Sequence, residues 1–64
     1  MKFVVEYKHF GKGEWEVDEE FDTAQKALEY ASLQAMGYAA TDHRVVVHNV
    51  PRVIATFEPM EDYR

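Results

Sequence analysis

Carboxylates are the side chains in this sequence whose types and spacing are best suited to chemistry. The chain has 12 acidic and 7 basic residues among 64, which gives a formal net charge of −5. Half of the acids fall between residues 14 and 22. Within that segment acids recur at every second position, namely at Glu14, Glu16, Asp18 and Glu20. A period of two predicts that these residues, the acidic strip, lie on one face of a strand.

The acidic strip has three interpretations. Carboxylates along a flat strand do not converge on one ion as the ligands of a calcium-binding loop do, so we predict no metal site. A row of charges also deters pairing at the edge of a sheet, and in that case the strip is simply solvated. The functional interpretation is a docking surface for a basic partner. That partner could be a nucleic-acid-binding protein, whose groove the strip would occupy by imitating the spacing of phosphates.

The other reactive residue types do not form a catalytic arrangement. There is no cysteine, and the only serine, Ser32, falls in a predicted helix rather than on a strained turn. His9, His43 and His48 lack the spacing of metal-ligand motifs. We predict His43 in a loop and His48 on a strand, both as surface or turn residues. We therefore expect no active site, no metal and no cofactor, and we predict that the protein is not an enzyme.

Composition and charge limit the class of protein. With 64 residues, of which 47% are hydrophobic and 14% aromatic, the chain has the composition of one small folded domain. Its lysines and arginines are scattered, which argues against direct binding of nucleic acid. No apolar run approaches the roughly 20 residues that span a bilayer, and no signal peptide is visible. We therefore expect no membrane partner and a cytoplasmic location.

Four segments show the patterns of strands, and a helical segment separates the second from the third. The strand segments are residues 2–8, 14–21, 44–49 and 53–58. On the second, Trp15, Val17 and Phe21 share the face opposite the acidic strip. We predict an α+β fold of order ββαββ, with one helix packed on one face of a four-stranded antiparallel sheet of strand order 2-1-3-4. The domain covers residues 1–58, and residues 59–64 form a flexible C-terminal tail.

The helix is predicted over residues 23–36, where helix-forming residue types dominate. Asp22 is the expected N-cap, with Gln25 completing a capping box, and Gly37 is the expected stop. One stripe along the helix is made of four alanines and a leucine: Ala24, Ala27, Leu28, Ala31 and Ala35. Such a stripe lets a helix lie close to a sheet. The large residues predicted to fill the space beneath it are Phe3, Tyr7, Trp15 and Phe57.

One helix on one face of a sheet leaves two surfaces uncovered, namely the outer side of the helix and the other face of the sheet. Opposite the alanines the helix carries Tyr30 and Leu33, flanked by Met36, which predicts an exposed patch that contacts a partner or a second copy. In the alternative, a rotated helix tucks Tyr30 or Met36 against the following loop. On the open face of the sheet, an apolar stripe is predicted from Val4, Val46 and Ile54. These residues could equally be scattered surface aliphatics.

Several segments together resemble small bacteriophage-encoded accessory proteins, the class that includes anti-CRISPR and host-takeover proteins. The segments are residues 15–23, the alanine-rich helix with Tyr30, Gly37-Tyr38, Arg44-Val45 and residues 53–57. The resemblance implies a compact, acidic protein without catalytic activity. It implies that the protein acts in the cytoplasm of a host cell by occupying a surface of a host or defence protein, often one that would otherwise hold nucleic acid.

These observations lead to one leading hypothesis and two rivals. The leading hypothesis is a non-catalytic protein-binding module that inhibits or modulates a host or defence protein. Its predicted contact residues are Glu14, Glu16, Asp18, Glu20, Tyr30 and Leu33. The alternative is a structural homodimer or assembly module, with contacts through Leu33 or the apolar stripe. An enzyme or small-molecule binder would need a pocket, and one helix on one sheet is expected to be too little to enclose a few hundred Å³.

Overall fold

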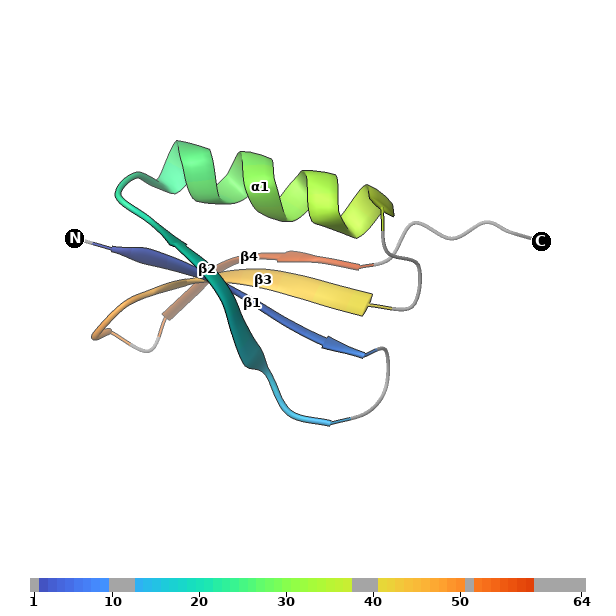
Figure 1. The fold of residues 1–64 in the computed structure, drawn as a ribbon. Coiled ribbons are helices and arrows are strands. Elements are labelled where there is room, and N and C mark those ends of the chain that lie inside the picture. Colours follow the sequence, from blue (N-terminus) through green and yellow to red (C-terminus); the bar gives the residue numbers. More distant parts are fainter. Residues whose placement is uncertain (1, 10–12, 38–40, 51, 59–64) are drawn as a thin grey trace.

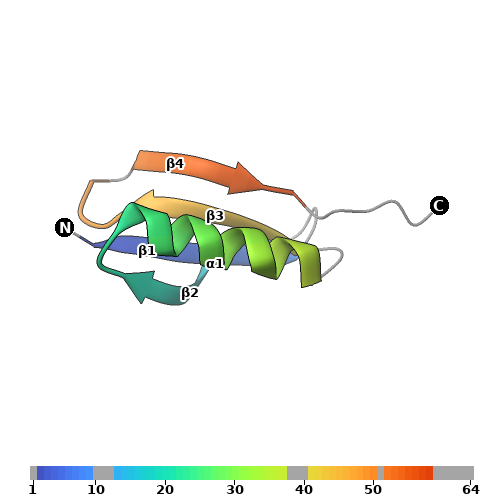
Figure 2. The ribbon, with the colours of Figure 1, turned by 90° about the horizontal axis from the view of Figure 1, so that it is seen from above.

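A four-stranded sheet and one helix make up the part of the chain that the computed structural model describes, which is residues 2–9, 13–37, 41–50 and 52–58. The elements in chain order are β1 (Phe3–His9), β2 (Glu16–Phe21), α1 (Ala24–Gly37), β3 (Thr41–Val47) and β4 (Arg52–Phe57). All neighbouring strands are antiparallel, in the order β2-β1-β3-β4. The helix lies over one face of the sheet (Figure 1, Figure 2). The predicted ββαββ fold is therefore confirmed, while the predicted tail, residues 59–64, lies outside the described residues.

The core lies between α1 and the two central strands. Val5 of β1 and Val45 of β3 are paired across the sheet. They pack against Ala27 and Ala31 of the helix, and all four side chains are fully buried. Partly buried side chains surround this cluster: Phe3, Phe21, Leu28, Tyr30 and Phe57. Because alanine adds so little bulk, the helix can pack closely on the valines of the sheet. The predicted alanine face of the helix is confirmed.

The pairing of β2 with β1 slips by one residue at Asp18. Val5 is the partner of Glu19, whereas the next residue, Glu6, is the partner of Val17, so Asp18 is an extra residue in β2. Such a β-bulge reverses the face to which every side chain beyond it points. Val17 therefore lies on the open face of the sheet with Glu6.

The prediction that Trp15, Val17 and Phe21 share the helix-covered face is wrong because of this bulge. Phe21 packs against the core, as predicted. Trp15 does not: its ring is stacked against the guanidinium of Arg44, with 4.2 Å between the Arg44 Cζ and the ring centroid. Arg44 is on the open face, since it pairs across the sheet with Glu6. Trp15 is thus not part of the core, contrary to the prediction.

The N-cap of α1 is Thr23, not the predicted Asp22. The backbone N–H of Lys26 donates to Thr23 Oγ1 at 3.2 Å, which is the hydrogen bond that defines an N-cap. The side chain of Gln25 instead donates to Glu29, one turn further along, at 3.4 Å. The predicted capping box is therefore not formed.

The third strand begins earlier than the hydrophobic pattern indicated. The helix includes Gly37, which was expected to follow it, and β3 begins at Thr41 rather than at Arg44. The reason is the length of β1, which continues to His9 and pairs there with Thr41. His43 consequently lies within a strand and not in a loop.

A shallow apolar groove of about 390 Å³ lies on the open face. Val4 and Val46, which line it with Val17, are partners across the sheet, and Val4 is buried. A second irregularity makes Val53 the partner of Val46, so Ile54 falls between two pairs. The stripe therefore includes Val53, and Ile54, which is also exposed, stands at the irregularity.

Candidate functional site

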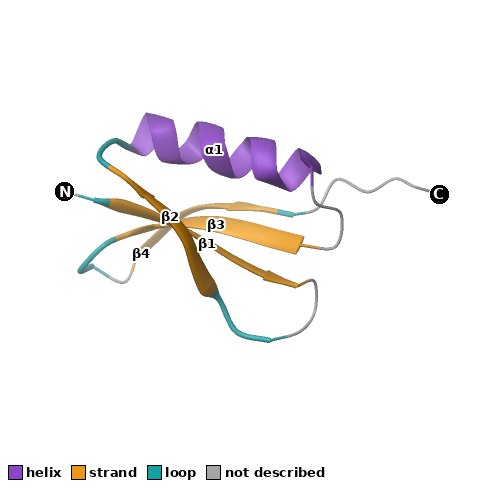
Figure 3. Ribbon diagram, in the orientation of Figure 1, coloured by secondary structure: helices purple, strands orange, loops and turns teal. Residues whose placement is uncertain are grey.

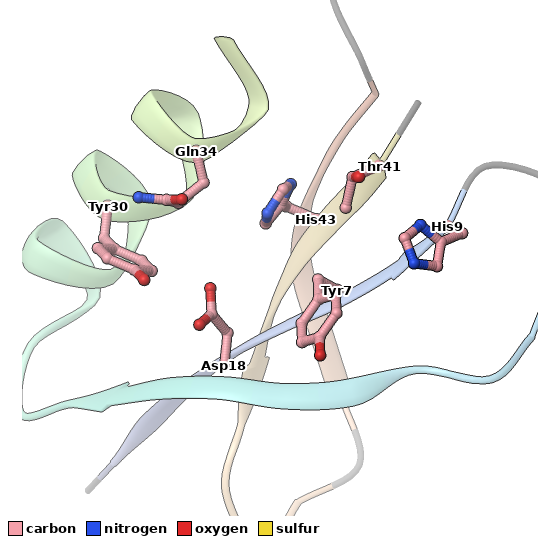
Figure 4. Close-up of a pocket in the computed structure, with 7 residues that line it drawn as sticks. All are labelled: Tyr7, His9, Asp18, Tyr30, Gln34, Thr41 and His43. Atoms are coloured by element: carbon pink, nitrogen blue, oxygen red, sulfur yellow. The ribbon is translucent and has the colours of Figure 1, made fainter. Parts of the chain in front are cut away.

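A hollow of about 320 Å³ opens between helix α1 and strands β1, β2 and β3 (Figure 4). It is lined by Tyr7 and His9 of β1, Asp18 of β2, Tyr30 and Gln34 of α1, and Thr41 and His43 of β3. Strand β2 reaches the helix only at its Phe21 end, and its Glu16 end lies well away from the helix (Figure 3). The hollow is open to solvent, so the expectation that this fold does not enclose a cavity of a few hundred Å³ is not contradicted, and the open space is large enough for a small group.

Asp18 is the acidic residue that the fold turns into this hollow. As the extra residue of the β2 bulge it is half-buried. Figure 4 shows its carboxylate directed towards the helix, between the rings of Tyr30 and Tyr7. Within the described residues no hydrogen bond or ion pair engages this carboxylate. Asp18 thus supplies an uncompensated negative charge to the hollow.

The other acids of the strip are distributed over both faces of the sheet. Glu16 lies opposite Tyr7, whose hydroxyl donates to Glu16 Oε1 at 3.3 Å. The negative charge of Glu16, together with this hydrogen bond, raises the pKa of Tyr7. Glu20 lies opposite Val4 on the open face, and its carboxylate is 3.5 Å from Lys2 Nζ. The prediction that the acidic strip shares one face is therefore wrong, because the bulge interrupts the alternation.

His43 is the residue of the hollow that sequence reasoning missed. Only 2% of it is exposed, so the interpretation as a surface or turn histidine is wrong. Its Nδ1 is buried and has no hydrogen-bond partner among the described residues. Burial lowers the pKa of His43, and the carboxylates of Asp18 and Asp42 oppose this only in part. The imidazole is therefore neutral at pH 7.

A signal for the burial of His43 was present in the sequence. The buried positions of β3 follow a period of two through His43, Val45 and Val47. Only the two valines are apolar, so the pattern appeared to begin after the histidine. Extending the alternation back by one step would have placed His43 on the helix-covered face.

The helix patch predicted from Tyr30 and Leu33 is divided in the structure. Leu33 is exposed, as predicted, and so is Met36. Tyr30 is half-buried instead, and its ring packs on Phe21 with 5.3 Å between the ring centroids. At 100° per residue, Tyr30 lies on the flank of the alanine stripe, one position before Ala31, and its long side chain reaches down to β2. Tyr30 is therefore not part of an exposed patch, and it reaches Phe21 without a rotation of the helix, whose alanine face is confirmed; the loop contact of the alternative lies outside the described residues.

Each polar side chain that is described as lining the hollow can accept a hydrogen bond, and Asp18 can only accept. Asp18 brings a carboxylate, and neutral His43 brings a ring nitrogen that is free of partners. Gln34 adds an amide whose oxygen accepts. The rings of Tyr7 and Tyr30 provide aromatic walls (Figure 4). This arrangement favours a flat, positively charged group that donates several hydrogen bonds.

The described ranges contain neither a metal-binding cluster nor a helix that could span a membrane. There, no group of three or more His, Asp or Glu side chains is arranged so that it could hold a metal ion. Nor do these residues include a helix that is long and apolar enough to cross a membrane. The features that characterise the hollow are therefore its hydrogen-bonding groups and its charge.

In comparisons with known proteins, no family model, no curated protein and no solved structure matches this chain. The resemblance to phage accessory proteins accordingly stays a prediction. The class of protein that the fold and the hollow define is a structural one. It is a small α+β protein in which one helix covers an antiparallel sheet and leaves an acceptor-lined hollow beside it.

Proposed function

We propose that this protein is a non-catalytic binding module that docks on a basic surface of another protein and thereby inhibits or modulates it. The docking surface is the acidic edge of the sheet, formed by β2 and the residues just before it. The predicted contact residues Glu14, Glu16 and Asp18 belong to this edge, and Glu19 joins them. Glu20 and Tyr30, which were predicted as contacts, are engaged elsewhere in the fold, with Lys2 and Phe21.

The observation that carries this proposal is the unbalanced charge at one sheet edge. Strand β2 is the outermost strand beside β1. Glu14 and Glu19 are exposed there, and within the described residues neither forms an ion pair. A concentrated field of one sign speeds association with a surface of opposite sign and disfavours partners of like charge.

The absence of catalysis is part of the proposal, and two local geometries support it. The hydroxyl of Ser32 donates to the backbone carbonyl of Glu29 at 3.0 Å, so it is committed to the helix rather than to a base. The Nδ1 of the buried His43 has no hydrogen-bond partner among the described residues, so it holds no nucleophile there. Following the sequence resemblance, the proposed partner is a host or defence protein with a basic groove that would otherwise hold nucleic acid.

Affinity capture from a host lysate followed by measurement on the purified pair tests the proposal. The double variant Glu14→Gln, Glu19→Gln removes two exposed charges from the acidic edge without touching the hollow. We expect its dissociation constant for the partner to rise at least about fivefold at low ionic strength. The difference from wild type should shrink as salt is added, because screening removes the steering by these charges.

Glu29→Gln is the matched control, since Glu29 is an exposed acid on the helix. Its affinity for the partner should stay within about twofold of wild type. If the double variant and the control bind equally well at every salt concentration, the acidic edge is not the docking surface and the proposal fails.

A second candidate function, homodimerisation, is favoured by the apolar open face of the sheet. Val17 and Val53 are 60% and 45% exposed there, beside the groove formed with Val4 and Val46. Exposed apolar surface of this kind is common at contacts between protein copies. In this case Val17→Lys should convert a dimer to a monomer.

Light scattering coupled to size-exclusion chromatography distinguishes the two routes to a dimer. Val17→Lys reports on the open face, and Leu33→Asp reports on the exposed helix residue. A wild-type monomer at the highest attainable concentration would eliminate the homodimer.

A further inference from the structure

The hollow between α1 and the sheet presents acceptor atoms from three different elements. The Asp18 carboxylate comes from β2, the Gln34 amide from α1 and the imidazole of His43 from β3. The buried Nδ1 of His43 has no hydrogen-bond partner among the described residues, and in the tautomer protonated at Nε2 it accepts from a donor that enters the hollow. His43 is itself almost fully buried, and its ring lies towards the helix in Figure 4. These acceptors require a ligand with several N–H donors that point in different directions.

The charge and the walls of the hollow narrow the choice of ligand. Asp18 has no ion-pair partner among the described residues, so a cation is favoured. The rings of Tyr7 and Tyr30 provide flat aromatic surfaces, against which a planar cation stacks well. A guanidinium group is planar and carries five N–H donors in a fixed plane, whereas an ammonium is a compact and strongly hydrated point charge. The hollow is therefore better suited to arginine than to lysine.

The protein already binds a guanidinium in this way on its open face. Arg44 is stacked on the ring of Trp15, and its Nε donates to Glu6 Oε1 at 2.8 Å. One aromatic ring and one carboxylate are enough to hold that group. The hollow offers the same two kinds of partner, and the residues described as lining it include no arginine or lysine.

We propose that the hollow beside Asp18 is a binding site for the guanidinium group of an arginine side chain from the partner protein. This inference rests on the proposed function, which supplies the basic partner. Asp18 is the charged acceptor, and Gln34 and His43 accept the remaining hydrogen bonds. The rings of Tyr7 and Tyr30 stack against the planar guanidinium. The acidic edge of β2 attracts the partner, and one inserted arginine side chain sets its position.

Titration of the full chain with N-acetyl-arginine methylamide, followed by amide NMR spectra, tests the inference directly. We expect saturable shifts concentrated at Asp18, Gln34 and His43, with a dissociation constant of about millimolar, as suits a single side chain. N-acetyl-lysine methylamide and the neutral N-acetyl-citrulline methylamide should each bind at least about fivefold more weakly. Equal binding of the lysine compound would overturn the inference, because it would indicate only general attraction between opposite charges.

Two variants assign the binding to the hollow. Asp18→Asn should weaken binding of the arginine compound at least about tenfold, since it replaces a charged acceptor by a neutral one. Glu29→Gln, an exposed acid of α1 that is absent from the lining and from the acidic edge, should change it less than about twofold. Gln34→Ala keeps a good helix former in α1 and should weaken binding severalfold. If Asp18→Asn retains wild-type affinity, the inference is wrong.

The source of the guanidinium is decided by comparing the capped arginine with free arginine. Free arginine carries an ammonium and a carboxylate whose charges cancel, so a site that takes only the guanidinium should bind it no more tightly than the capped compound. Tighter binding of free arginine would instead indicate a small-molecule site and overturn the assignment to a partner side chain.

Failure of this inference can be told apart from failure of the proposed function. If Glu14→Gln, Glu19→Gln weakens partner binding while Asp18→Asn acts no more strongly than Glu19→Gln alone, the acidic edge docks the partner and the arginine site is wrong. If none of these variants affects partner binding, the docking surface itself is wrong.

Discussion

Arg44 and Trp15 are stacked on the open face of the sheet, with the guanidinium carbon of Arg44 4.2 Å from the centroid of the Trp15 ring. Lys8 Nζ lies 5.1 Å from the same ring. Trp15 precedes β2 and Arg44 belongs to β3, so the contact reaches across β1 and ties the start of the edge strand to the centre of the sheet. The bulge at Asp18 makes this possible, because it moves Val17 and Trp15 from the helix-covered face to the open face.

Trp15 and Arg44 are expected to be coupled in stability. Alanine at either position removes the stacking, so the effects of the two single variants on the free energy of unfolding should not add in the double variant. We expect a coupling of about 0.5–1 kcal/mol, as for other partly exposed cation–π contacts. Urea unfolding of the four proteins measures it. Strictly additive effects would show that the stacking contributes nothing.

Thr23 is expected to matter more than Asp22 for the start of the helix. Thr23→Ala removes the acceptor of the Lys26 N–H and should lower the free energy of unfolding by about 0.5–2 kcal/mol. Asp22→Ala should cost only a few tenths of a kcal/mol, through the loss of a negative charge near the helix N-terminus. Urea unfolding of both variants is the measurement. A larger loss for Asp22→Ala would contradict the N-cap seen in the structure.

Ala31 should not tolerate a larger side chain. Its Cβ is fully buried against the sheet, so Ala31→Leu must push the helix away or force strained rotamers, at a cost of about 1–3 kcal/mol. Glu29→Leu introduces the same side chain at an exposed position of the same helix and should change stability by less than about 0.5 kcal/mol. Thermal unfolding compares the two variants, and an equal effect of both would argue against close packing at Ala31.

His43 should make the stability of the protein depend on pH. In the unfolded chain its pKa is the ordinary 6.5, and in the folded chain burial lowers it. Between these two values the unfolded state binds more protons. The free energy of unfolding therefore falls as pH decreases from above 6.5 through the lowered pKa of His43, and the contribution is fully present above 6.5. The negative charges of Asp18 and Asp42 and a hydrogen bond with the Thr41 backbone raise the pKa of His43 and so limit the size of the effect.

Comparison with His43→Gln isolates this contribution from the other titrating groups. Urea unfolding at about pH 7.5 and about pH 5.5 should show a smaller loss of stability in the variant than in wild type. A direct NMR titration of the His43 ring should give a pKa below 6.5. An NMR pKa at or above that value would contradict the burial of an uncharged imidazole.

Local pattern was sufficient for the order of elements, the alanine face of the helix and the antiparallel sheet. These features depend on periodicity and on residue types within one segment, which are visible in the chain itself. Leu33 was also placed correctly, because it lies opposite the alanine stripe. The N-cap was misplaced by one residue, since Asp22 and Thr23 are both good caps and only the helix geometry distinguishes them.

The candidate site depended on relations between segments that no single segment contains. The bulge at Asp18 arises where β2 pairs with β1, and it decides which acids and aromatics lie on each face. The burial of His43 depends on how far β1 extends to pair with β3. Since side-chain direction in a strand reverses with each residue, a slip of one position in pairing brought Asp18 into the hollow and moved Trp15 out of the core. The concentration of acidic residues around residue 18 is thus visible in the sequence. The hollow that one of them, Asp18, lines forms only in the tertiary structure.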